Sequence, residues 1–135
     1  MGQTDALYES LSGRENLAFF GALQRMSGHP LKREVLRVAR IVHLENALDR
    51  GVRDYSGGMK RRLSLAIALI GDPRLLMLDE PTVGIDPELR IQIWDDLHRL
   101  AEEGHAIIFT THVMADAAEA DTLMMIRDGG IIAEG

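Results

Sequence analysis

Cysteine is absent from the 135-residue sequence, and aromatic side chains make up only 4% of it. The lack of thiols excludes disulfide bonds, cysteine-based metal sites and dithiol redox chemistry, and it agrees with a reducing compartment. Because aromatic residues are few, the hydrophobic content of 46% comes mainly from aliphatic side chains. This composition fits one small domain with an aliphatic α/β core.

Long apolar runs are also missing. The longest uninterrupted run spans residues 65–70, whereas a helix needs roughly 18 or more apolar residues to cross a bilayer. No segment resembles a signal peptide. We therefore expect any connection with a membrane to be made through a partner protein.

The sequence has no excess of basic residues. Its formal charge is −6, and its carboxylates are spread along the whole chain. A general nucleic-acid binder would usually present a basic surface, so we expect no nucleic-acid partner. Without spaced histidine or cysteine pairs, a transition-metal site made only of protein ligands is not indicated either.

Apolar residues recur at helical spacing in the first third of the chain. Ser12 and Glu15 have the spacing of a capping box, which predicts a helix over residues 13–26. A turn over residues 27–30 precedes a second predicted helix, and residues 44–48 can add a short third. The second helix is marked by four apolar positions: Leu31, Val35, Val38 and Val42.

Two adjacent phenylalanines lie in the first predicted helix. Leu17, Phe20 and Leu23 fall near one face, and Phe19 cannot share that face with Phe20. One ring can pack inward while the other contacts a partner, or both can be covered within the domain. The sequence leaves the two alternatives open.

Ser56, Gly57 and Gly58 precede another predicted helix. Two glycines let backbone N–H groups approach a phosphate, and the Ser56 hydroxyl lies at the positive end of the helix. These residues therefore predict an anion-binding site. The basic run over residues 60–62 either faces nucleotide phosphates or forms a solvated patch. The inner face of this helix is predicted from four positions: Leu63, Ala66, Ile67 and Ile70.

Two consecutive carboxylates follow an apolar strand. Residues 74–78 predict a fully buried parallel strand, and Asp79 and Glu80 come at its carboxyl end. Ligands gather beside that end of the strands in open α/β sheets. Successive strand residues point in opposite directions, so the two carboxylates can do different work.

The rest of the chain predicts alternating helices and strands. Asp86 precedes Pro87 in an N-cap and N1 arrangement, which starts a helix that runs to about residue 103. A second strand over residues 105–110 leads to His112. The remaining predicted elements are a short helix over 114–120 and a closing hairpin over 121–133, in which Met124 and Met125 are expected to fill the core.

The order and spacing of these motifs resemble those of ATP-binding cassette (ABC) domains. Residues 56–58 look like the family's signature motif, and residues 75–81 look like its Walker B strand. The resemblance implies an α/β fold: a partial P-loop NTPase (ABC-type) sheet with a helical signature subdomain. It assigns residues 1–72 to the Q-loop and helical subdomain, and residues 73–135 to the C-terminal part of the catalytic core.

The same resemblance implies roles for individual residues. Asp79 would hold Mg²⁺ through water, helped by Gln3, and Glu80 would orient or deprotonate the water that attacks the γ-phosphate. His112 would sense bound ATP. Without the family context, Gln3 reads as a solvated terminal residue. The residues implied to bind the nucleotide are Gln3, Ser56, Gly57, Gly58 and Asp86, the last within a D-loop that crosses to the opposite subunit.

One phosphate-binding motif of the family does not occur in these 135 residues. No G-x-x-x-x-G-K-[ST] pattern is present, and neither Lys32 nor Lys60, the only lysines, follows such a glycine pattern. We therefore expect the 135 residues alone to bind ATP poorly and to be inactive. Tyr55 and Met59 also depart from the family's usual Leu and Gln, and Met59 cannot offer a side-chain amide.

The absence of this motif from the 135 residues also affects the expected sheet. In the family's sheet, the strand before that loop lies between the strand that ends at Thr110 and the one that begins near Thr122. Its absence leaves unpaired strand edges, which invite pairing with another chain. We expect either strand exchange in a dimer or displacement of the last strands.

The resemblance implies an ATP- and Mg²⁺-dependent ATPase subunit that powers export. Residues 17–21 and 55–59 look most like the multidrug or polysaccharide exporter branch. The implied partners are a transmembrane permease subunit and a second nucleotide-binding domain in a head-to-tail dimer, at the cytoplasmic inner face of the cell membrane. Two alternatives remain: a non-transport ABC ATPase that acts on ribosomes or DNA, and a non-catalytic module that supplies its signature motif to another cassette.

Overall fold

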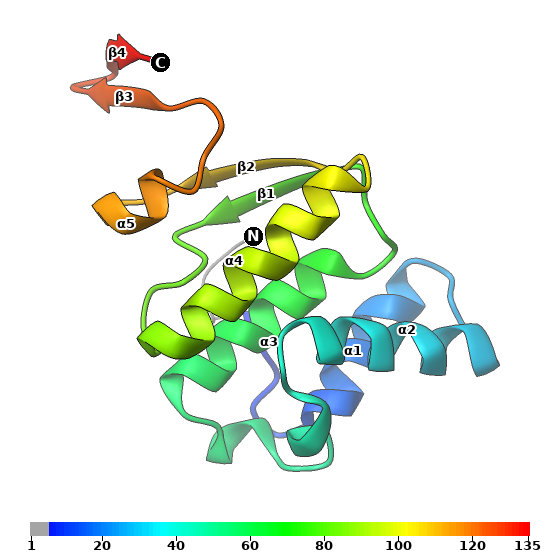
Figure 1. The fold of residues 1–135 in the computed structure, drawn as a ribbon. Helices are drawn as coiled ribbons and strands as arrows, with labels where there is room; N and C mark the ends of the chain where they lie inside the picture. The colour runs from blue at the N-terminus through cyan, green and yellow to red at the C-terminus, as the bar shows by residue number, and fades with distance from the viewer. Residues whose placement is uncertain (1–5) are drawn as a thin grey trace.

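A computed structural model describes residues 6–135 (Figure 1). Helices dominate the first half of the chain, and strands alternate with helices in the second half. The elements are α1 (Gly13–Leu23), α2 (Gly28–Ile41), η2 (Glu45–Ala47), η3 (Val52–Asp54), α3 (Gly57–Leu69), β1 (Leu75–Asp79), α4 (Pro87–Glu102), β2 (Ala106–Thr110), α5 (Met114–Ala117), β3 (Met124–Arg127) and β4 (Gly130–Glu134). None of the helices within residues 6–135 is both long and apolar enough to cross a membrane.

The capping box predicted for α1 is present. Ser12 Oγ accepts from the backbone N–H of Glu15, and Glu15 Oε1 accepts from that of Ser12, both at 3.1 Å. The helix ends at Leu23 rather than residue 26, because Arg25 adopts a left-handed backbone with φ of +64°. Leu17 is buried, whereas Leu23, near the end of the helix, is 65% exposed.

The two phenylalanines of α1 take different environments. Phe20 is half-buried and packs against the core, whereas Phe19 faces outward. Phe19 meets Tyr8 edge to face, with ring centroids 5.1 Å apart. The alternative in which both rings are covered within the domain is therefore wrong.

Helix α2 begins earlier than predicted. Residues 28–30 already belong to the helix, with Ser27 at its N-cap, so the predicted four-residue turn is too long. Gly28 has φ of +59°, a conformation that glycine adopts without steric cost. Val35, Val38 and Val42 are buried, and the predicted inner face is confirmed.

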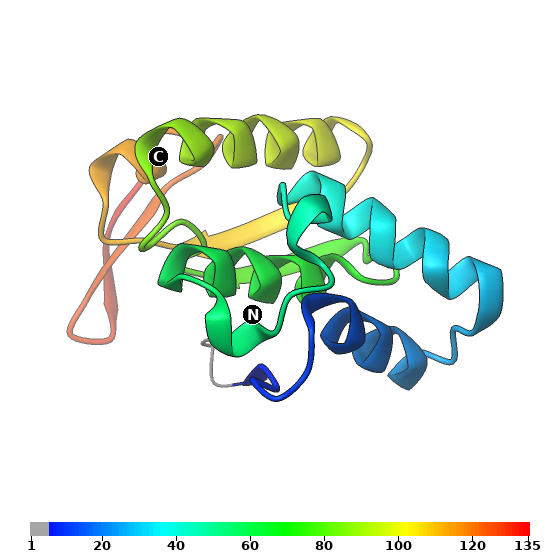
Figure 2. The same ribbon diagram turned by 90° about the horizontal axis from the view of Figure 1, so that it is seen from below.

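β1 and β2 form a parallel two-stranded sheet. Leu76 and Leu78 of β1 are buried on the face that packs against the core cluster with α3 and α4 (Figure 2). On the other face Leu75 and Ile108 are exposed, and Met77 is 61% exposed. The parallel direction is confirmed, but the prediction of a fully buried strand is wrong, since burial on both faces requires a layer on each side.

β3 and β4 form a separate antiparallel hairpin that lies apart from the β1–β2 sheet (Figure 1). Its turn contains Asp128 and Gly129, both with positive φ, which suits a two-residue hairpin turn. Met124 and Met125 are exposed, so the prediction that they fill the core is wrong. Among the described residues the last strands are displaced from the first sheet, which is one of the two outcomes expected from the missing strand.

A half-buried ion pair joins α2 to the end of α3. Glu34 contacts Arg37 Nε at 2.5 Å, and its Oε2 accepts from the backbone N–H of Gly71 at 2.8 Å. Arg37 Nη2 also donates to Leu69 O at 3.1 Å. Burial alone would raise the pKa of Glu34, but the hydrogen bonds from Arg37 and Gly71 outweigh burial and lower this pKa.

Glu34→Gln tests this junction. A carboxyl whose pKa is lowered by folding contributes stability above its unfolded pKa, and this contribution is lost as the pH falls through the folded pKa. We expect the variant to lose about 1 kcal/mol at neutral pH and to show a shallower loss of stability on acidification than the parent chain. Urea unfolding between neutral and acidic pH measures both. Glu45→Gln, an exposed carboxylate on η2, is the control; equal acid sensitivity of E34Q and the parent chain would contradict the assignment.

Candidate functional site

The carboxyl ends of β1 and β2 bring the predicted acidic and histidine motifs together. In the parallel register Asp79 pairs with Thr110, and the chain continues to Glu80 after β1 and to His112 after β2. Both strand ends lie at one edge of the sheet, where α/β proteins commonly hold ligands. The sequence predicted each motif beside the end of a strand, and the parallel pairing places them side by side.

Hydrogen bonds connect the two strand ends. Thr110 Oγ1 donates to Asp79 Oδ1, and the backbone N–H of Glu80 donates to Thr110 O at 3.0 Å. His112 Nδ1 is in hydrogen-bond contact with Glu80 Oε1. The His112 side chain is 90% exposed, so Glu80 is its main anchor. Sequence reasoning named Glu80 and His112 but gave no sign that they touch, and it missed Thr110.

Glu80 has an unusual backbone conformation. Its φ is +47°, and a left-handed conformation costs a residue with a side chain roughly 1–2 kcal/mol. The conformation is held at both ends, because the Glu80 N–H bonds to Thr110 O and the Glu80 O accepts from Arg61 Nη2 at 2.8 Å. Strained residues of this kind cluster at functional sites when their surroundings hold them in place.

The basic run after Gly58 does not act as one patch. Lys60 Nζ pairs with Glu9 at 2.6 Å, which lowers the pKa of Glu9. Arg62 Nη1 donates to His43 O at 2.9 Å, and burial lowers the pKa of the Arg62 guanidinium. Arg61 Nη2 donates to the backbone carbonyl of Glu80, next to Asp79. The solvated-patch interpretation therefore fails for Arg61 and Arg62.

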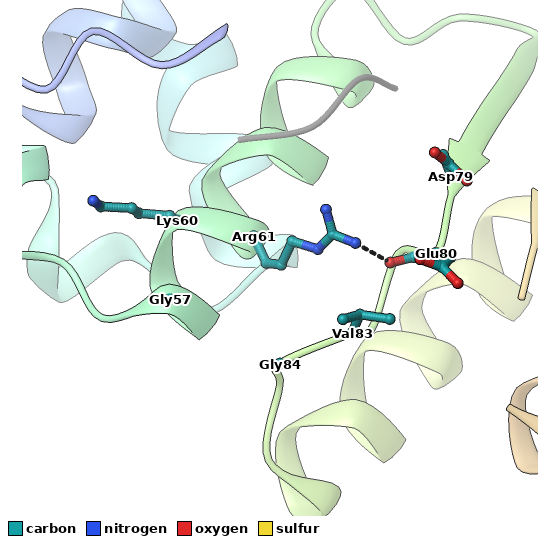
Figure 3. A pocket seen from close by; sticks show the side chains of 7 residues that line it. All are labelled: Gly57, Lys60, Arg61, Asp79, Glu80, Val83 and Gly84. Atoms are coloured by element: carbon teal, nitrogen blue, oxygen red, sulfur yellow. Dashed lines mark hydrogen bonds between the residues drawn. The ribbon is translucent and has the colours of Figure 1, made fainter. Parts of the chain in front are cut away.

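An open pocket of about 380 Å³ lies between α3 and the carboxyl end of β1 (Figure 3). Arg61 spans it toward Glu80, while Lys60 points away from both carboxylates. The residues that line the pocket are Gly57, Lys60, Arg61, Asp79, Glu80, Val83 and Gly84. The pocket thus joins the start of the glycine-led helix to the acidic strand end.

The predicted N-cap of α4 is confirmed, and Ser56 caps α3. Ser56 Oγ accepts from the backbone N–H of Met59 at 3.1 Å, and Asp86 Oδ1 accepts from that of Leu89 at 3.0 Å. The N–H groups of Gly57 and Gly58 have no acceptor within residues 6–135. The first turn of α3 therefore keeps two donors for a ligand.

The site offers hard oxygen donors of the kind that Mg²⁺ prefers. Asp79 Oδ1 accepts from Thr110, and Asp79 Oδ2 accepts no hydrogen bond within residues 6–135. No three metal-ligating side chains converge in the described part of the chain, so an ion there would need oxygen ligands from water or a phosphate. This donor set fits Mg²⁺ held by few carboxylates together with substrate phosphates. Gln3, the other predicted ligand, lies outside the described residues.

A second polar cluster, around Asp116, adjoins the site, and the sequence analysis did not predict it. Asp116 of α5 is buried and accepts from Thr82 Oγ1 at 2.5 Å and from Trp94 Nε1 at 3.0 Å. Its partners are far from it in the chain, and an aspartate in an alanine-rich stretch gave no signal of burial.

Comparisons with known proteins agree with this geometry. The family model described as ABC transporter matches residues 1–83. Nod factor export ATP-binding protein I of Rhizobium meliloti is 46% identical over 134 residues, which cover 98% of this chain and 40% of the relative. ABC transporter A family member 8 of Arabidopsis thaliana is 48% identical over 132 residues, or 96% of this chain and 14% of the relative. The chain thus spans well under half the length of these relatives.

A solved structure shares the fold. MJ0796, an ATP-binding cassette in a dimeric post-hydrolysis state bound to ADP and Pi, superimposes with a TM-score of 0.91 at 24% identity. The match covers all of this chain and 60% of the cassette chain. It confirms the predicted α/β fold with a partial ABC-type sheet. The family model, which matches more than half of the sequence, shows that this chain belongs to the ABC transporter family.

Proposed function

We propose that the protein carrying this chain is an ATP-hydrolysing, nucleotide-binding subunit of an ABC exporter. The observation that carries the proposal is the contact of His112 with Glu80, directly beside Asp79 at a ligand-accessible sheet edge. The names of the relatives, which include export ATP-binding proteins, support the direction of transport. Since the chain spans only part of those relatives, the proposal concerns the whole protein.

Glu80 acts as the general base in this proposal. Its Oε1 contacts His112, and its side chain is about two thirds buried, so the carboxylate is oriented before substrate arrives. It accepts the proton of the water that attacks the γ-phosphate, and His112 keeps the carboxylate and the phosphate in line. Asp79 would hold Mg²⁺ through water, and the ion would neutralise charge on the phosphate oxygens.

The start of α3 serves as an anion-binding site. Ser56 Oγ uses a lone pair to cap Met59, which leaves its hydroxyl proton for a ligand, and the Gly57 and Gly58 N–H groups point out of the helix start. In a head-to-tail dimer these donors face the nucleotide of the second subunit. Asp86, which caps α4, lies in the loop proposed to cross between subunits.

The remaining assignments concern partners and location. We assign residues 1–72 to the Q-loop and helical subdomain and residues 73–135 to the catalytic core, and Gln3 to the nucleotide and Mg²⁺ site. Phe19 faces outward from α1 and is a candidate contact for a transmembrane permease subunit at the inner face of the cell membrane. The 135 residues contain no P-loop pattern, so ATP turnover needs a P-loop supplied from elsewhere.

Phosphate release from ATP tests the catalytic assignment. We expect negligible turnover by the 135-residue chain, and restored turnover when a relative's P-loop-containing cassette half is added, because phosphoryl transfer depends on positioning by both halves. Glu80→Gln should lower the restored rate by about 10²- to 10⁴-fold. Glu102→Gln, on the exposed side of α4, is the control and should leave the rate unchanged.

Turnover by the chain alone would contradict the need for a second half. Turnover that survives Glu80→Gln would remove Glu80 from the role of base.

The two glycines of the signature segment provide a matched pair of substitutions. A Cβ on Gly57 meets nothing within 4 Å, whereas a Cβ on Gly58 would lie 2.9 Å from Gly84 O. We expect Gly57→Ala to change the unfolding free energy by less than about 0.5 kcal/mol. Gly58→Ala should destabilise the chain by roughly 1–3 kcal/mol, because two backbone segments must move apart.

The same pair separates binding from folding. Gly57→Ala should keep its urea unfolding curve yet lower complemented ATP turnover by about tenfold, since a methyl group would stand where the phosphate approaches. Full turnover in Gly57→Ala would exclude Gly57 from the anion site.

A further inference from the structure

Asp116 is a buried carboxylate with polar partners on several sides. It is 1% exposed. Thr82 Oγ1 donates to its Oδ2 at 2.5 Å, and Trp94 Nε1 donates to its Oδ1 at 3.0 Å. Arg90 Nε lies 3.7 Å from Oδ1, and Thr111 Oγ1 lies 3.5 Å from Oδ2. A buried carboxylate is strongly destabilising without such partners, so Asp116 depends on these contacts.

Two partners of Asp116 come from the segments that carry Glu80 and His112. Thr82 lies two residues after Glu80, and Thr111 directly precedes His112. Trp94 and Arg90 lie on α4, which packs against the sheet. One carboxylate therefore ties both segments of the site to the rigid helix behind them.

The exposed imidazole needs such a support. The His112 side chain is 90% exposed, so packing does not fix its direction. Its backbone is constrained from both sides: Thr111 Oγ1 accepts from the Val113 N–H at 2.9 Å, and the Asp116 N–H donates to Val113 O at 3.1 Å. Asp116 closes this turn and simultaneously holds the hydroxyl of Thr82 on the Glu80 side.

We propose that Asp116 is a positioning residue for the Glu80–His112 pair, acting through Thr82 on one side and Thr111 on the other. The proposal rests on the function proposed above, in which this pair acts on the γ-phosphate. Asp116 touches no substrate; it sets the distance and direction between the two groups that do. A purely structural role would instead secure α5 against α4 without affecting the pair.

Nuclear magnetic resonance of the ¹⁵N-labelled chain separates the two roles without needing activity. Trp94 is the only tryptophan, so a single indole N–H signal reports the contact with Asp116. The ring nitrogens of His112, assigned by comparison with His112→Gln, report its contact with Glu80. Asp116→Asn keeps the size of the side chain but replaces one acceptor oxygen with a donor, so Thr82 or Trp94 loses its acceptor.

We expect Asp116→Asn to shift the indole signal and the His112 ring signals together. Thr82→Val, which removes the hydroxyl on the Glu80 side, should shift the His112 signals as well, and it decides the question if Asp116→Asn does not fold. Glu119→Gln is the matched control, because it also changes a carboxylate to an amide close to α5, where its exposed partner is His98. A moved indole signal with unchanged His112 signals in both variants would overturn the proposal.

Complemented turnover gives a second readout. Asp116→Asn should lower kcat by about tenfold and change KM less than about twofold, since it disturbs the reacting pair rather than nucleotide binding. Unchanged kcat would count against the proposal. If the parent chain shows no complemented turnover, the proposed function fails, while the coupling of the Trp94 and His112 signals still reports whether Asp116 positions His112.

Discussion

Parallel pairing of β1 with β2 is the constraint on which the site depends. The register runs from Leu75 with Ala106 to Asp79 with Thr110, so the two chains leave the sheet at the same edge. Glu80 and His112 are 32 residues apart in sequence, yet this pairing brings them into contact. A shift of one residue would turn the side chains of a strand to the other face and separate the acidic end from its threonine partner.

Arg61 links this edge to the glycine-led helix. Its guanidinium donates to the carbonyl of Glu80, whose left-handed backbone is otherwise unfavourable for a glutamate. The close approach of Gly58 to the Gly84 carbonyl adds a second connection between α3 and the segment after β1. The start of α3 and the acidic strand end therefore line one pocket.

Local signals in the sequence predicted the helix starts well. Ser12 and Asp86 cap α1 and α4 as expected, because an N-cap depends on residues within one turn. Burial was harder to predict, since it depends on layers contributed by distant segments. Leu75 and Met124 are exposed for this reason.

In the candidate site, too, the residues could be predicted from the sequence, but the contacts between distant segments could not. The family resemblance pointed to Asp79, Glu80 and His112 as candidate site residues, whereas the Glu80–His112 contact depends on strand register. The support from Asp116 could not be predicted, because its closest hydrogen-bond donors, Thr82 and Trp94, are 34 and 22 residues away.

The most direct test of the whole account is a crystal structure of the complete cassette with Glu80→Gln and bound Mg²⁺–ATP. The account predicts the γ-phosphate beside residue 80 and His112, with the ion near Asp79; a nucleotide bound away from this edge would contradict it.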